Sequence, residues 1–350
     1  MDKTTELNRP TAPAPVKLHS RPWAAAVLIA GGLVSIVLGL VLSVSFGVAD
    51  VRFGVVWEAV FHYNPDIQEH QIIHTLRMPR AIAAAMVGAC FAVAGAVMQG
   101  MTRNPLADSS LLGLNAGAGL MLSVCFAFFP GLHFTFVLFF SFLGAAFGAV
   151  LVYGIGSLAK GGTSAVRLVL AGAAISALLN ALNEGISLYF QVGQDVAFWY
   201  AAGVTGVKWE QIAMMLPWFA AALLGSIMIS RSITVLHFGE ETARGLGVRT
   251  ELVKLAGAGI VLVLAGGAVA LVGGVGFVGL IVPHIVRKLT GPDYRYIIPC
   301  SAVLGSVLVL FADLAARMVH PPYETPLAAL TAVIGVPFFL YLARKEGRER

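Results

Sequence analysis

Long apolar blocks recur along the whole chain and constrain its fold more than any other feature. A helix of about 20 residues is about 30 Å long, which matches the hydrocarbon core of a bilayer. Only 12% of the 350 residues are charged, against about 25% in an average soluble domain. Because lipid offers no hydrogen bonds to backbone groups, such blocks must form helices. The sequence therefore predicts an all-α membrane protein with many spans.

Hydropathy divides the chain into ten expected membrane spans. Their approximate bounds are 23–46, 80–99, 111–130, 134–158, 168–190, 212–230, 252–272, 275–289, 297–315 and 326–343. A polar, Pro-rich tail (1–22) precedes this ten-span domain (23–343), and a short basic tail (344–350) follows it. The first apolar block is longer than a signal-peptide core and lacks a convincing cleavage site, so we expect an uncleaved span.

Basic residues are distributed unevenly between the two sides of these spans. With a cytoplasmic N-terminus, 18 of the 23 Lys and Arg residues fall on the cytoplasmic side. The remaining five, on the outer side, are Arg52, Arg77, Arg80, Lys208 and Arg317. Cytoplasmic loops of membrane proteins carry an excess of Lys and Arg. Both termini are therefore expected in the cytoplasm, and the net charge of +5 reflects topology rather than nucleic-acid binding.

The stretch TLRMPRAIAA (75–84) places Arg77 and Arg80 at the expected outer start of the second span. Residues three apart share one face of a helix, and Pro79 suits a first helical turn because its missing N–H would have no partner there. The partial positive charge of a helix start disfavours arginine, so an anionic partner is expected. Lipid phosphates and an anionic protein in the outer space both fit this requirement.

Few polar side chains occur inside the spans. Asn180, Asn183 and Glu184 form an i, i+3, i+4 stripe, and Glu184 lies about 25 Å along the helix from Arg167, near the outer boundary. The stripe can line a substrate path or make hydrogen bonds between helices. A stand-alone secondary transporter would need ion-binding carboxylates at mid-depth, and a membrane enzyme would need converging His, Asp and Glu residues. The sequence shows neither pattern.

Two further groups of residues carry structural expectations. Asp313 and Arg317 are four apart and are expected to form an ion pair, with Glu324 as the alternative partner of Arg317. The three cysteines lack the spacing of a metal site and are expected to be buried thiols with no disulfide. They are Cys90, Cys125 and Cys300.

The longest expected cytoplasmic connection, 231–251, joins the sixth and seventh spans. Its small and apolar residues Leu236, Gly239, Ala243 and Leu246 are spaced for a short amphipathic helix, so the loop is either a solvated linker or a docking element. The chain contains no GxxxxGK[ST] motif, and its Gly-rich stretches lack the context of a dinucleotide fingerprint. The chain is therefore not expected to bind ATP by itself.

The segment LRMPRAIAAAMVGACFAVAGAVMQGMTRNPLADSSLLGLNAGAG (76–119) resembles the signature of the iron–siderophore, haem and cobalamin class of ABC importer permeases, of the FecCD type. Further matches follow in family order: RLVLAG (167–172), GEETARGLGV (239–248), GFVGLIVPHIVR (276–287), ADLAAR (312–317) and ETPLAALTAVIGVPFFLYL (324–342). The resemblance implies a type II ABC importer permease fold. Its two halves, spans two to five and seven to ten, would have inverted topology, as in many transporters.

The resemblance also implies a function without covalent chemistry, cofactor or metal. Such a subunit moves an iron chelate across the bacterial cytoplasmic membrane, with a ferric siderophore favoured over haem or cobalamin. Its partners are membrane lipid, a second permease subunit, two ATPase subunits and an extracytoplasmic substrate-binding protein. No nucleic acid is involved.

Individual residues match positions of known role in this class. Arg77, Arg80 and Arg317 match arginines that dock carboxylates of the binding protein. Residues in the motif that couples to the ATPase are Gly239, Glu240, Ala243, Leu246 and Gly247. The stripe Asn180, Asn183 and Glu184 is a candidate lining of the pathway. A cytoplasmic gate is expected near Ser164, Ala165 and Val166, where the Thr/Ser pair of the cobalamin permease is not kept.

Overall fold

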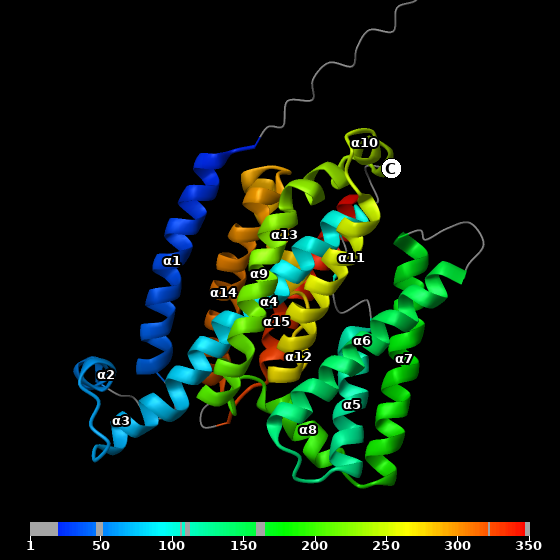
Figure 1. Cartoon of the computed structure of the whole chain (residues 1–350). Coiled ribbons are helices and arrows are strands. Elements are labelled where there is room, and N and C mark those ends of the chain that lie inside the picture. The colour runs from blue at the N-terminus through cyan, green and yellow to red at the C-terminus, as the bar shows by residue number, and fades with distance from the viewer. Residues whose placement is uncertain are drawn as a thin grey trace, which may run out of the picture.

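A computed structural model describes residues 20–46, 52–105, 107–108, 113–158, 165–320 and 323–346, and every regular element in these ranges is helical (Figure 1). The helical segments, in chain order, are α1 (Pro22–Ser45), α2 (Phe53–Phe61), α3 (Gln68–Ile72), η1 (Ile73–Arg77), α4 (Met78–Thr102), α5 (Leu114–Phe128), α6 (Phe134–Leu158), α7 (Ala165–Tyr189), α8 (Gly193–Ala202), α9 (Trp209–His237), α10 (Glu240–Gly245), α11 (Thr250–Val261), η3 (Leu262–Gly266), α12 (Gly267–Val272), α13 (Val278–Thr290), α14 (Tyr294–Val319) and α15 (Leu327–Glu346). The segments η1 and η3 are π-helical.

The ten expected spans correspond to ten helical stretches. These are α1, α3 to α4, α5, α6, α7, α9, α11 to α12, α13, α14 and α15. Within the described ranges, six stretches are long and apolar enough to cross a membrane, and α5 and α15 supply shorter apolar helices. The predicted fold class, an all-α membrane protein of about ten spans, is confirmed.

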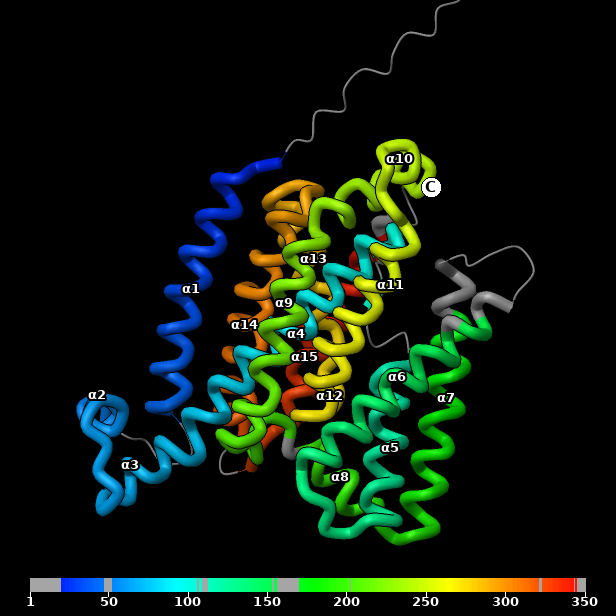
Figure 2. Tube along the Cα trace, in the orientation of Figure 1, coloured from blue at the N-terminus to red at the C-terminus, as the bar shows by residue number. Residues whose placement is uncertain are grey.

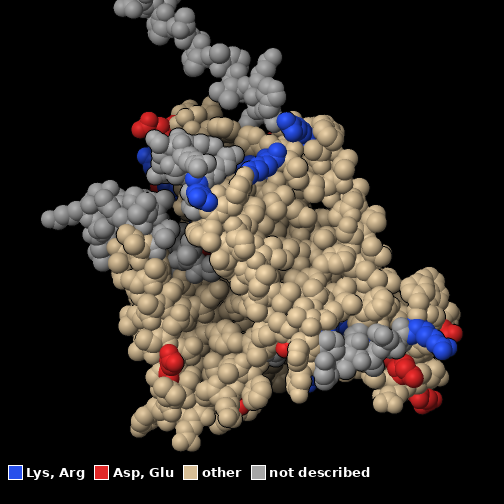
Figure 3. Space-filling view, turned by 180° about the vertical axis from the view of Figure 1, so that it is seen from behind, with Lys and Arg blue, Asp and Glu red and all other residues tan. Residues whose placement is uncertain are grey.

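The bundle has two ends. The short helices α2, α3 and α8 lie at one end, called the α8 end below, and α10 lies at the other, called the α10 end (Figure 1). The segment from α3 to α4 runs towards the α10 end, whereas its counterpart from α11 to α12 runs away from it, as inverted halves require (Figure 1). On the face in Figure 3, charged side chains gather near the ends and leave a wide band largely free of charge between them.

Helix α4 forms the centre of the bundle, packed against α9, α11, α13 and α14. Its sequence is rich in Ala and Gly, and nearly all of its side chains are buried. A Cβ atom at Gly88 would collide with the Gly305 carbonyl of α14, and one at Gly95 with the Gly279 carbonyl of α13. Small residues therefore let the backbones approach closely, which is how helices pack in a membrane.

The helix of the second span begins earlier than the sequence predicted, because it includes the π-turn η1. Helical structure begins at Gln68, so Arg77 and Arg80 do not stand at a helix start. The Met78 N–H donates to the Ile73 carbonyl, as in a π-turn, and the His74 carbonyl accepts the indole N–H of Trp209 at 2.7 Å. A widened turn before Pro79 lets the helix continue although proline has no N–H, and η1 thus also ties α9 to this end of the bundle.

Helices α5, α6, α7 and α8 form a second group beside the α4 bundle (Figure 2). They contact the rest of the chain mainly through η3, α12 and α9. Within this group Gly117 packs against the backbone of Gly144, so glycine again brings two helices together. Helix α7 contacts α5, α6 and α8, and its other face carries exposed side chains.

The connection expected at 231–251 is shorter than the sequence suggested. Helix α9 continues to His237, and α11 begins at Thr250. Between them lies α10, which confirms a short helix in this loop. Leu236 belongs to α9 and is buried there, so it is not part of the amphipathic face of α10.

Candidate functional site

Charged residues from distant parts of the chain meet at the α8 end. Arg77 ends η1, Arg80 lies in the first turn of α4, Asp313 and Arg317 lie in the last turns of α14, and Glu324 precedes α15. We call these five residues the arginine cluster. The sequence placed these arginines together on the outer side, and the structure shows that all three are buried.

Arg80 holds the two carboxylates of the cluster. Its Nε and Nη2 atoms donate to Asp313 at 3.1 and 2.8 Å, and its Nη1 donates to Glu324 at 2.7 Å. Arg317 Nη2 lies 3.2 Å from the other oxygen of Asp313, which confirms the predicted i,i+4 pair. Glu324 is thus hydrogen-bonded to Arg80 rather than to Arg317. Asp313 is 1% exposed and Arg80 8%, so the pairs of Asp313 with the two arginines are shielded from water, whereas Glu324 is exposed.

Two of the arginines also cap the end of α1. Arg77 Nη1 donates to the carbonyls of Val44 and Ser45 at 2.7 and 3.0 Å, and Arg317 Nη1 donates to the Ser43 carbonyl at 3.0 Å. The last carbonyls of a helix lack intrahelical partners and carry partial negative charge. Helix α1 has no basic residue in its own last turn, so arginines distant in sequence supply this cap. Sequence reasoning missed this contact.

The two carboxylates of the cluster are both held by arginine. Burial alone would raise the pKa of Glu324, but hydrogen bonds from Arg80 and Thr205 outweigh it and hold that pKa below its usual value. Glu324 is therefore ionised at neutral pH.

A second network joins α4, α13 and α14 near the α10 end. Arg287 Nη2 donates to Gln99 Oε1 at 2.7 Å and to the Tyr294 hydroxyl at 3.3 Å. The Gln99 amide in turn donates to the Gly279 carbonyl at 3.1 Å. Gln99 and Arg287 lie within the segments 76–119 and 276–287 on which the family resemblance rests, but the sequence alone did not pair them.

Helix α10 and its flanks carry the five candidate coupling residues. Gly239 and Gly247 have positive φ angles of 135° and 78°, which L-residues rarely adopt, and so they set the turns on either side of the helix. Ala243 is fully buried against its own chain, whereas Leu246 is 70% exposed. A hydrogen bond from Lys254 and the charge of Arg244 keep the pKa of Glu240 below its usual value, although burial opposes this. Contacts within this chain thus stabilise α10, and the side chain of Leu246 is left exposed.

The polar stripe of α7 divides into two parts. Asn183 accepts a hydrogen bond from Ser123 of α5 and contacts Ser187, so it links helices. Asn180 and Glu184 are exposed on the face of α7 that no described helix covers. Asn183 therefore makes the hydrogen bonds between helices that one alternative expected, whereas Asn180 and Glu184 face away from the described helices.

Other predicted residues are placed as follows. Ser164 lies outside the described residues. Ala165 and Val166 are the first residues of α7, and the structure describes their backbone. Cys90, Cys125 and Cys300 are buried free thiols, as predicted. Among the described residues, no group of three or more His, Cys, Asp or Glu side chains could hold a metal ion.

The fold and these motifs define a transport permease. The FecCD transport family model matches residues 35–345, and the chain belongs to that family. It is consequently a multi-pass membrane protein with the architecture of a transport family.

Individual relatives give a more specific comparison than the family model. The chain is 51% identical over 338 residues to the Iron(3+)-hydroxamate import system permease protein FhuB of Bacillus subtilis, covering 97% of this chain and 88% of that one. It is 38% identical to the Iron-uptake system permease protein FeuB of the same organism, covering 95% and 99%. A solved inward-facing structure of a metal-chelate type ABC transporter is 27% identical, with a TM-score of 0.77 and coverage of 91% and 99%.

Removing the charge of Arg80 tests whether the cluster stabilises the fold. Arg80→Gln leaves the buried carboxylate of Asp313 with less compensation, and breaking a buried pair costs about 3–5 kcal/mol. We expect the R80Q protein to lose its monodisperse peak in size-exclusion chromatography at a clearly lower temperature than the wild type. The matched control is Arg244→Gln, which removes an exposed pair worth about 0–1 kcal/mol. Equal temperatures for R80Q and R244Q would contradict a stabilising role.

Proposed function

We propose that this chain is the membrane-spanning permease subunit of an ABC importer for a ferric hydroxamate siderophore. The observation that carries the proposal is the 51% identity, over 97% of the chain, to a permease of an iron(3+)-hydroxamate import system. The likeness to a metal-chelate type ABC transporter over nearly its whole length agrees with it. Haem and cobalamin are the alternative cargoes.

In this proposal the chain supplies a pathway and no covalent chemistry. ATP is hydrolysed by two partner ATPase subunits, because the sequence contains no GxxxxGK[ST] motif. The ATPase docks on α10, where Leu246 and the neighbouring Phe238 are exposed apolar side chains. Exposed apolar residues on a polar loop are typical of an interaction site.

The α10 end is then the cytoplasmic side. The basic residues counted on that side of the spans support this orientation. Both tails (1–22 and 344–350) are cytoplasmic in the proposal, and most of each lies outside the described residues. The α8 end faces the outer aqueous space, where a substrate-binding protein delivers the chelate.

The same orientation makes the arginine cluster a docking site for that binding protein. The support for docking is that these arginines lie in LRMPR and ADLAAR, two of the motifs on which the resemblance to the family rests. Burial of Arg77, Arg80 and Arg317 means that each arginine also stabilises the fold. A docking test must therefore separate binding from stability.

The pathway is proposed to run along the open face of α7, between this chain and a second permease subunit. Asn180 and Glu184 are polar and exposed on that face. Polar groups at such a position in a membrane protein usually face a partner helix or a water-filled path. Asn183 contributes to packing instead.

Iron uptake tests the function directly. In a strain that lacks this chain, the restored chain should recover uptake of ⁵⁵Fe-labelled ferric hydroxamate, and haem or labelled cobalamin should not enter through it. Leu246→Asp should abolish this uptake, because a carboxylate replaces the apolar contact to the ATPase, and should also prevent co-purification of the ATPase.

Leu246→Met serves as the matched variant, because it keeps an apolar side chain of similar volume and should retain uptake. Restoration of haem or cobalamin uptake instead would change the proposed cargo. Normal uptake with L246D would show that α10 does not couple the ATPase.

Removing the charge of Arg77 tests whether the arginine cluster docks the substrate-binding protein. Purified binding protein should bind the assembled importer about fivefold more weakly after Arg77→Gln, which corresponds to ~1 kcal/mol for one partly solvated ion pair. Arg77→Lys keeps the charge but loses the forked hydrogen bonds to α1, so it should bind nearly as the wild type does. If Kd is the same for R77Q and the wild type, the arginine serves the fold and not docking.

Cysteine labelling tests the pathway. Cysteines at Asn180 and Glu184 should react with a water-soluble thiol reagent in the assembled importer, and one at Asn183 should react much more slowly. The native cysteines are buried and add little background. Protection of both exposed positions in every transport state would mean that this face is covered by protein or lipid.

A further inference from the structure

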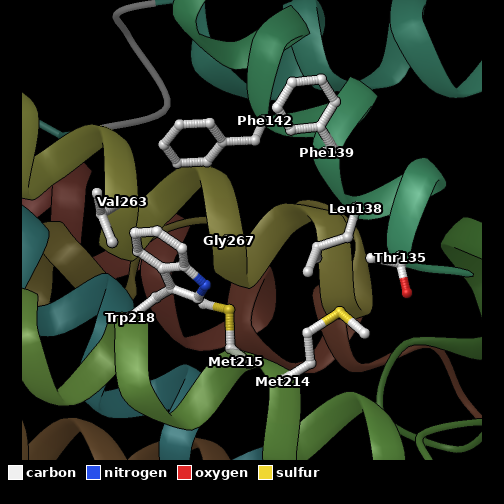
Figure 4. A pocket seen from close by; sticks show the side chains of 9 residues that line it. All are labelled: Thr135, Leu138, Phe139, Phe142, Met214, Met215, Trp218, Val263 and Gly267. Atoms are coloured by element: carbon white, nitrogen blue, oxygen red, sulfur yellow. The ribbon is translucent and has the colours of Figure 1, made fainter.

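A cavity of about 320 Å³ lies where the two helical groups meet, between α6, α9 and the stretch formed by η3 and α12. Its lining residues are Thr135, Leu138, Phe139, Phe142, Met214, Met215, Trp218, Val263 and Gly267. Figure 4 shows the side chains of α6 and α9 on opposite sides of the α12 ribbon, with Gly267 between them. The volume falls at the lower end of the range for small-molecule sites, about 300–1,000 Å³.

The positions of the lining residues along their helices place this cavity inside the membrane. All of its lining residues belong to stretches that are long and apolar enough to cross a bilayer. Thr135 is the second residue of α6 at the α8 end, and Phe142 lies about 10 Å further along the helix. Met214 and Trp218 follow the first residue of α9, Trp209, by five and nine positions. The cavity thus begins near the α8 end and extends into the adjacent leaflet.

The chemistry of the lining changes along this depth. Thr135 is its one polar side chain, and its hydroxyl points away from the other labelled side chains in Figure 4. All deeper residues are aliphatic, aromatic or methionine. The mouth is open to the surface, because Phe139 and Trp218 are exposed there. A ligand that fits must be apolar along its length and enter from the hydrocarbon.

The backbone of η3 and α12 shapes the inner wall. The end of the buried Met215 side chain occupies the space where a Cβ atom at Gly267 would lie. The π-turn η3 carries Val263 into the lining, and π-turns inside helices occur frequently at functional sites. Methionine and aromatic side chains adapt well to a flexible apolar ligand.

We propose that the cavity binds an acyl chain of a membrane phospholipid from the leaflet at the α8 end. Hydrocarbon is the solvent at this depth, and an unfilled void would lose dispersion contacts with its lining. A helix from a second copy, about 10–12 Å across with its side chains, is too wide for a cavity of about 320 Å³. The preference over bulk lipid comes from packing rather than from exclusion of water.

Photolabelling of the assembled importer tests this site. The importer is reconstituted in vesicles of phosphatidylethanolamine and phosphatidylglycerol that contain phosphatidylglycerol with a diazirine in its acyl chain. After irradiation, lipid adducts should concentrate on peptides 135–142 and 214–218. Val263→Phe fills the cavity from η3 and should abolish these adducts. Met214→Trp fills it from α9 and should also abolish them, which keeps the test available if V263F does not fold.

Val150→Phe is the matched control, because Val150 is an exposed residue of α6 outside the cavity. Adducts on the two peptides should persist in V150F. Three results would overturn the proposal: adducts that persist in both filled variants, adducts spread evenly over the exposed helices, or covalent links between two copies of the chain.

Discussion

The fold depends on the close approach of helix backbones around α4. Within hydrocarbon, burial of apolar side chains gives no driving force between helices, so contact area and dispersion must hold them together. Ala and Gly cover most of α4, and Gly88 and Gly95 meet the backbones of α14 and α13 directly. Larger residues at these positions would force the helices apart and remove the contacts that hold the bundle.

This packing also determines where the charges at the α8 end can lie. Since α4 is buried from its first turn, Arg80 enters the bundle rather than the aqueous phase. Its charge is stabilised only because α14 brings Asp313, and the segment before α15 brings Glu324, within hydrogen-bonding distance. The end of α1 gains its cap from the same place, through Arg77 and Arg317. The residues proposed to dock the binding protein are therefore also residues that stabilise the fold.

Hydropathy predicted the spans and charge predicted a common side for the arginines, because both signals are properties of single segments. The i,i+4 pair of Asp313 and Arg317 was predictable for the same reason. The capping of α1 and the pair of Arg80 with Glu324 depend on contacts between distant segments. The start of the second span was wrong because Pro79 suggested a first turn, whereas a π-turn carries the helix past it. Hydropathy also could not show that Ala243 faces inward and Leu246 outward.

The helices of the α4 group are joined to one another more firmly than they are joined to the α5 to α8 group. Around α4, buried ion pairs at the α8 end and the Gln99–Arg287 network near the α10 end fasten the same helices at both ends. Breaking a buried pair costs about 3–5 kcal/mol, so this group resists internal rearrangement. The α5 to α8 group instead meets it mainly through η3, α12 and α9, where a cavity interrupts the packing. Relative movement of the two groups thus costs least at this apolar boundary. Under the proposed function, sliding at this boundary is the least costly way to change access along α7, because the arginine cluster and α10 then keep their internal geometry.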